Sequence, residues 1–159
     1  PALLDRGPLV ERARAALVDR GVVELARLEA AIVLAERDDA IEWLATPEAE
    51  LPDDLDGGQV FAHRQVIRLD LSHDVLTAHA EGGAPAPGPQ TLLVVGFDEA
   101  VSVVPVPPEV AAAVEALGPR AAPLDLDPSW ARELIGAGVL GWRPIPGGAG
   151  RGAVRARRP

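Results

Sequence analysis

The spacing of apolar residues differs between the first third of this chain and the segment that follows it, and that change limits the folds open to it. Up to residue 46 the apolar residues recur at spacings of three and four, which is the period of an α-helix. Around residues 67–71, Ile, Leu and Leu alternate with Arg and Asp, which is the period of a β-strand. We therefore expect an α+β fold in which helices come first and β-hairpins follow.

Residues 1–47 predict a pair of helices. Pro8 and the apolar stripe behind it indicate a first helix, and Gly21 marks its end. A second stripe begins at Val22 and ends before Pro47, because a residue that precedes proline is pushed out of the helical region. Two such helices cannot bury both of their apolar faces alone. We expect this segment to pack on the sheet, to form a homodimer or to dock on a partner.

Residues 59–143 are expected to hold a β segment and a C-terminal winged-helix-like module, after an acidic linker at residues 48–58. The predicted strands are residues 61–71, 75–79, 91–97 and 101–104, of which the last two form a hairpin. Two helices should follow: one opens at Pro108, and the other is capped by Asp127 and ends at Gly138. Residues 144–159 show no apolar period and predict a disordered basic tail.

Composition excludes several classes of function. The chain has no Cys, so disulfides, thiolate zinc sites and cysteine nucleophiles are impossible. Its 15 basic residues stand against 24 Asp and Glu, and the net charge of −9 makes nucleic acid an unfavourable partner. The apolar runs are too short to span a membrane, and the charged N-terminal residues do not resemble a cleavable signal. We expect a cytoplasmic protein with no membrane partner.

One predicted hairpin contains residue types that bind metals, namely His63, His73, His79, Asp70 and Asp74. Their spacing does not make them converge, because His73 is expected in a turn and the other histidines lie on either side of it. The run Ser72-His73-Asp74 contains the residue types of a catalytic triad, but adjacent side chains in a turn diverge. The sequence therefore favours a protein without catalytic residues, metal or cofactor over an enzyme subunit that uses this hairpin.

The most readable pattern combines a hairpin with two helices: TLLVV and VSVV at residues 91–95 and 101–104, PEVAAAVEAL at 108–117, and DPSWARELIGAGVL at 127–140. With these features, residues 91–142 resemble the winged-helix recognition elements of ribosomally synthesised and post-translationally modified peptides (RiPPs) and the related peptide chaperone of pyrroloquinoline quinone synthesis. The middle helix of that family is short or missing here, at residues 121–126. A similar unit closes certain cupin-type oxygenases after a helical dimerisation segment, but their catalytic barrel and metal-binding histidines are absent from this sequence.

The resemblance implies an accessory protein that captures a precursor (leader) peptide and presents it to a modifying enzyme. The peptide would be held as an extra strand, because ladder hydrogen bonds supply affinity and side-chain pockets supply selection. Carried onto this chain, the edge strand would be Val101, Ser102, Val103 and Val104, and the flanking helix would present Trp130, Arg132 and Glu133. Pro105 and Pro107 cannot donate to a ladder, so they would end the usable edge.

Three other interpretations stay open from the sequence alone. In the first, residues 101–104 form a central strand that is paired on both sides, and Trp130 is a core residue. In the second the chain is a winged-helix DNA-binding regulator, although the helix after Asp127 contains a single basic residue, Arg132. In the third the chain is a structural or regulatory subunit of a larger enzyme complex.

Overall fold

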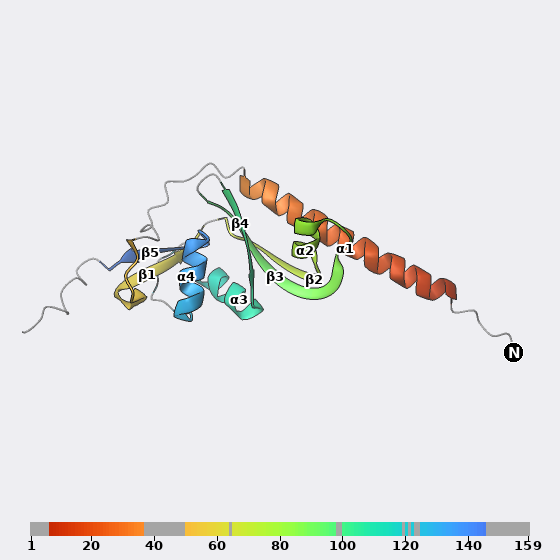
Figure 1. The fold of residues 1–159 in the computed structure, drawn as a ribbon. Helices are drawn as coiled ribbons and strands as arrows, with labels where there is room; N and C mark the ends of the chain where they lie inside the picture. Colours follow the sequence, from red (N-terminus) through yellow and green to blue (C-terminus); the bar gives the residue numbers. More distant parts are fainter. Residues whose placement is uncertain are drawn as a thin grey trace, which may run out of the picture.

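The computed structural model describes residues 7–36, 50–63, 65–97, 100–118, 120, 122 and 125–145, with the backbone alone described for residues 7–19 and for position 97. The elements are, in chain order, α1 (Gly7–Glu36), η2 (Leu55–Gly57), β1 (Gly58–Ala62), β2 (Ile67–Asp74), α2 (Val75–Glu81), β3 (Ala86–Phe97), β4 (Ala100–Val106), α3 (Pro108–Leu117), α4 (Pro128–Gly136) and β5 (Leu140–Pro144). Figure 1 shows an N-terminal helix followed by strands, which confirms the α+β prediction.

The predicted helix end at Gly21 is wrong, since α1 is one continuous helix of 30 residues. Gly21 is placed instead where α1 meets the end of β2. A Cβ atom there would lie 3.3 Å from the His73 ring and 3.4 Å from Pro85. Glycine inside a helix costs about 1 kcal/mol relative to alanine, which the close packing of α1 offsets. Residues 9–36 are therefore no helical pair, and residues 37–47 lie outside the described part of the chain.

Two corrections concern the first predicted hairpin. The single strand expected over residues 61–71 is two strands in different sheets: β1 pairs with β5, and β2 pairs with β3. The strand expected over residues 75–79 is part of helix α2. Asp74 ends β2 and caps this helix, because its side chain accepts a hydrogen bond from the Thr77 N–H at 3.1 Å. The apolar residues after Asp74 indicated a strand, but the N-cap decides the local structure.

The second hairpin and the two C-terminal helices are confirmed. Strands β3 and β4 are antiparallel, although β3 begins already at Ala86, inside the Gly- and Pro-rich segment expected as a loop. Helix α3 begins at Pro108 as predicted. Helix α4 is capped by the Asp127 carboxylate, which accepts from the Ser129 N–H at 2.9 Å. This helix ends at Gly136, and the predicted end, Gly138, adopts a positive φ of 76° in the turn that follows.

The three-stranded sheet β2-β3-β4 is covered on both faces. We call the apolar residues between it and α1 the α1-side cluster: Leu28, Ala31, Ala35, Leu69, Leu71, Val75, Leu92 and Val94. The other face belongs to a C-terminal cluster built mainly from β1, α3, α4 and β5 together with the alternate residues Leu93, Val95, Val104 and Val106. Because successive strand residues point to opposite faces, the side chains of β3 are buried on both faces of the sheet. An added strand could therefore approach this sheet only at its edges.

Two sequence predictions concern the C-terminal tail and the membrane. Among the described residues, no helix is long and apolar enough to cross a membrane. The disordered tail was predicted from residue 144, but Pro144 is the last residue of β5 and pairs with Gly58. Residues 146–159 lie outside the described residues, so the predicted disorder there stays a prediction. Strand β5, which closes the segment that resembles a recognition element, pairs with β1 at residues 58–62 and thus outside that segment.

Candidate functional site

Strand β4 is an edge strand. In the sheet order β2-β3-β4, it pairs with β3 alone among the residues that the structure describes. Pro105 stands opposite Leu92 in this pairing. In an antiparallel ladder, residue pairs alternate between those that exchange hydrogen bonds and those whose N–H groups point away from the partner strand. Proline has no N–H, so Pro105 fits a pair of the second type. By this alternation Val101 and Val103 share the orientation of Pro105, so their N–H groups point away from β3.

The four edge residues of the sequence prediction therefore divide into two kinds. Val101 and Val103 present outward-facing amides, whereas the amides of Ser102 and Val104 face β3. The side chains also divide: Val101 and Val103 pack against the α1-side cluster, and Val104 is buried in the C-terminal cluster. Ser102 is half-buried on the same face as Val104. The edge thus offers two donors to an added strand, at alternate residues as a β-ladder requires.

Helix α1 borders this edge. Glu24 binds Ser72 of β2 through its carboxylate. The pKa of Asp70 on the same strand is lowered chiefly by the hydrogen bond from the Thr91 hydroxyl, and the charge of Arg27 adds a smaller effect in the same direction. Successive helix residues turn by about 100°, which places Leu25 and Ile32 on the opposite flank of α1, on the side of β4. Both are half-buried and pack against the α1-side cluster, as Val101 and Val103 do. We call Leu25 and Ile32 the β4 flank of α1.

The three helix residues predicted to flank the edge lie elsewhere. Helix α4 packs on β5, and Figure 1 shows it beside the β1–β5 pair. Trp130 is half-buried against the C-terminal cluster, and Glu133 is exposed. The Arg132 guanidinium donates to the backbone carbonyls of Pro52, at 2.6 Å, and Asp53. The structure therefore does not bring these three residues together with residues 101–104. The bordering helix is α1, which no local pattern in residues 91–142 could indicate.

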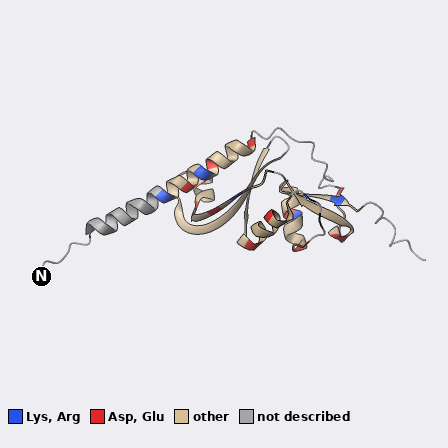
Figure 2. Ribbon diagram, turned by 180° about the vertical axis from the view of Figure 1, so that it is seen from behind, with Lys and Arg blue, Asp and Glu red and all other residues tan. Residues whose placement is uncertain are grey.

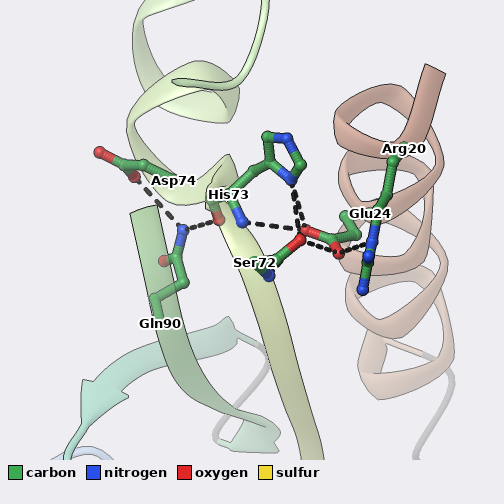
Figure 3. A network of polar contacts seen from close by, with 6 residues as sticks. All are labelled: Arg20, Glu24, Ser72, His73, Asp74 and Gln90. Carbon is green, nitrogen blue, oxygen red and sulfur yellow. Dashed lines mark hydrogen bonds and ion pairs between the residues drawn. The ribbon is translucent and has the colours of Figure 1, made fainter. Parts of the chain in front are cut away.

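A buried polar network ties α1 to β2 (Figure 3). Glu24 and His73 are 4% and 3% exposed. The Glu24 carboxylate accepts from the Ser72 N–H at 2.9 Å, the Ser72 hydroxyl at 2.8 Å and the His73 N–H at 3.0 Å, and it lies 3.1 Å from the Nδ1 atom of His73. The two backbone donors belong to a break in the β2–β3 register between Leu71 and His73. Glu24 supplies the acceptors that this irregular backbone lacks.

This network contains the residue types of a triad without the geometry of one. In a triad the hydroxyl and the carboxylate engage opposite ring nitrogens of the histidine. Here the Ser72 hydroxyl, at 3.0 Å, and the Glu24 carboxylate both approach Nδ1 of His73. Asp74 instead accepts from the Thr77 N–H and from Gln90. The arrangement holds α1 against β2. Glu24 was missed from sequence, although an acidic residue three positions after Gly21 and four before Leu28 interrupts the apolar stripe.

The Glu24 network predicts a specific loss of stability in acid. Burial raises the pKa of Glu24, but the hydrogen bonds from Ser72 and His73 together outweigh burial and lower it from 4.5 to about 2. Because the folded-state pKa lies below the unfolded one, this stabilisation is complete above about pH 4.5 and is lost as the pH falls toward 2. Chemical denaturation at several pH values should show a steeper decrease in this window for the native protein than for Glu24→Gln. Equal slopes would contradict the assignment.

The three histidines are far from forming a ligand set. His63 follows β1 and accepts the Gln65 N–H at its Nδ1 atom, at 3.2 Å, whereas His79 lies exposed on α2. Within the described ranges, no group of three His, Asp or Glu side chains is placed to hold a metal ion. The His73 ring meets the Glu24 carboxylate and the Ser72 hydroxyl at Nδ1, and the His73 carbonyl accepts from the Gln90 side-chain amide at 2.6 Å.

No protein-family model matches this chain, and no curated protein matches it at a significant level. The features that bear on function are therefore the geometry of the β4 edge and its border and the resemblance of residues 91–142 to recognition elements.

Proposed function

We propose that this protein is a noncatalytic accessory protein that binds an extended peptide as a fourth strand beside β4 and presents it to a partner enzyme. One observation carries the proposal. Among the described residues β4 is paired on one side only, while both faces of its sheet are covered. An incoming strand would complete the ladder without disturbing the core. Unpaired edges of this kind are the sites at which proteins add peptide strands.

The border of the edge supports recognition of side chains as well as backbone. An added strand presents every second side chain to the α1 side of the sheet, where Leu25 and Ile32 provide a half-buried apolar surface. The amides of Val101 and Val103 would supply the ladder bonds, and Pro105 would end them. Beside Pro105 lies a shallow depression lined also by Leu76 and Gln90. We therefore expect a guest with apolar residues at alternate positions.

The resemblance of residues 91–142 to recognition elements supports a leader peptide of a ribosomally synthesised precursor as this guest, and a peptide-modifying enzyme as the partner. In the proposal, the β4 flank of α1 replaces Trp130, Arg132 and Glu133 as the flanking surface. The DNA-binding alternative is less well supported, because Arg132 is the one basic residue of α4 and already binds the carbonyls of Pro52 and Asp53.

The direct test uses synthetic peptides that cover the short reading frames encoded beside the gene. Each peptide is added to the isotope-labelled protein, and the amide chemical shifts are followed by NMR. The proposal expects saturable shifts at Val101 and Val103, with smaller ones at Leu25 and Ile32. Shifts confined to α4, or shifts absent with every peptide, would contradict it.

Proline at position 103 should abolish most of the peptide affinity. Val103→Pro removes one outward donor and places the proline ring where the guest backbone must approach, so we expect binding to weaken by about tenfold or more. Val103→Ala is the matched control, because it shortens the same side chain and keeps the amide. Fluorescence anisotropy with a labelled peptide measures both, and thermal unfolding shows that each variant is folded. Equal weakening in the two variants would indicate recognition through the side chain instead of the ladder.

A further inference from the structure

The face of α1 that points away from the sheet is apolar. Four of the five large apolar residues that are exposed in the described part of the chain lie on this helix: Val22 (53%), Val23 (59%), Val33 (45%) and Leu34 (57%). Single exposed apolar residues are common, but a contiguous group marks an interaction site. We call these residues, together with the exposed Ala26 and Ala30 between them, the outer face of α1.

The outer face has the same chemistry on both sides of its centre. Ala26 and Ala30 stand on either side of residue 28, and the larger residues lie farther out, with Val22 and Val23 toward one end and Val33 and Leu34 toward the other. Leu28 itself is fully buried and points at the sheet. Small residues let two helix axes approach closely at a crossing, and larger ones fill the space where the axes diverge. A two-fold axis can therefore place this surface against a copy of itself.

We propose that the outer face of α1 binds a second copy of this chain and forms a two-fold symmetric dimer. Burial of the exposed valines and leucine supplies the driving force. The bodies of the two copies lie on opposite sides of the helix pair, because each α1 covers its own sheet with its other face. This interface uses different residues from the β4 edge, so it does not depend on the proposed peptide binding.

The charges beside the outer face favour a second copy of the chain as the binding partner. They also favour one relative direction of the two α1 helices. Arg27 and Glu29 border the alanine centre on opposite sides, since they precede and follow the inward-pointing Leu28 by one residue each. Both are exposed, and Figure 2 shows basic and acidic residues along the part of α1 whose side chains are described, residues 20–36. In a near-parallel crossing, Arg27 of each copy faces Glu29 of the other. An antiparallel crossing would oppose Arg27 to Arg27 and Glu29 to Glu29.

The same charges disfavour a lipid surface. Helices that lie on membranes carry an excess of Lys and Arg on their polar side. Over residues 20–36, α1 has two basic residues, Arg20 and Arg27, and three acidic ones, Glu24, Glu29 and Glu36. Of these, Glu24 is buried by the Ser72 and His73 network. A neutral to acidic helix with matched opposite charges about its centre fits a second copy better than anionic lipid.

Charge exchange tests the proposal with variants that leave the core untouched. The full chain is studied by sedimentation velocity over a wide concentration range, with circular dichroism to show that each variant is folded. We expect concentration-dependent dimers for the native protein. Arg27→Glu and Glu29→Arg should each weaken dimerisation by tenfold or more, because each places like charges together. A mixture of the two single variants, and the double variant R27E/E29R, should restore it.

An apolar variant tests the outer face itself. Val23→Asp should give a monomer at concentrations where the native protein is a dimer, and its peptide affinity should stay unchanged. The proposal is overturned by a native protein that is monomeric at every concentration, by a dimer that Val23→Asp leaves intact, or by single charge variants that dimerise as the native protein does. Loss of peptide binding with an intact dimer would contradict the proposed function alone.

Discussion

Replacement of Glu24 by alanine is expected to lower the free energy of unfolding by about 3 kcal/mol or more. The carboxylate accepts three hydrogen bonds from Ser72 and His73 and lies beside the His73 ring in a buried site. Alanine leaves two backbone N–H groups in the β2 irregularity without an acceptor, and each such group costs about 1–3 kcal/mol. Urea denaturation followed by tryptophan fluorescence or circular dichroism measures the change.

Two controls separate this network from charge on the helix surface. Arg20 lies 3.3 Å from the same carboxylate, but its side chain is 66% exposed, so Arg20→Ala should cost less than about 1 kcal/mol. Glu24→Gln keeps an acceptor oxygen and should fall between the two. If Glu24→Ala were as mild as Arg20→Ala, the network would not be what anchors α1 to β2.

Alanine at position 96 is the second large effect that we expect. Gly96 lies on β3 where the end of α1 crosses it, and a Cβ atom there would clash with the backbone carbonyl oxygen of Ala35. A backbone atom cannot move aside as a flexible side chain does, so either α1 or β3 must shift. Overpacking of this kind costs about 1–3 kcal/mol, and we place Gly96→Ala near the top of that range, measured by urea denaturation.

Gly57 is the matched control, because no atom lies within 4 Å of a Cβ built on it and its φ is not positive. Gly57→Ala should change stability by less than about 0.5 kcal/mol. A large effect at both positions would point to a general intolerance of alanine in place of glycine. A small effect at both would show that α1 does not approach β3 as closely as the structure has it.

These two contacts fix α1 at two points, one at Glu24 in the interior of the helix and one at Ala35 near its C-terminal end. Glu24 holds the helix to β2 near α2, and Ala35 touches β3 at Gly96, close to the β3–β4 hairpin connection. The β4 flank of α1 is thereby held beside the edge, and the outer face is held toward solvent. A variant that loosens either contact should therefore weaken peptide binding through the position of Leu25 and Ile32, without touching the edge itself.

Among the described residues β4 is paired on one side only, and an unpaired strand edge has a cost that two features of the chain limit. Such an edge invites pairing with any other strand, including one from another copy. Pro105 shortens the edge because it lacks an N–H, and α1 restricts which side chains an added strand can carry on its side. The same features that would give a peptide receptor its selectivity thus also protect the fold against indiscriminate edge pairing.

The sequence by itself determined the elements that depend on local signals. The β3–β4 hairpin, the start of α3 at Pro108 and the Asp127 cap of α4 follow from residues a few positions apart, because strand period, proline geometry and N-capping act over that range. Local signals do not decide the structure at Gly21 or after Asp74, because a glycine and a short apolar run each allow two local structures.

Only the tertiary structure decided which surfaces face each other. Gly21 lies inside α1 and packs closely against the His73 ring and Pro85, which are 52 and 64 residues away in sequence. Glu24 meets Ser72, 48 residues away, and α1 instead of α4 borders β4. Contacts between residues so distant in sequence depend on the packing of whole elements, which no local pattern specifies. For that reason β4 could be predicted from the sequence, whereas the helix beside it and the outward direction of its amides could not.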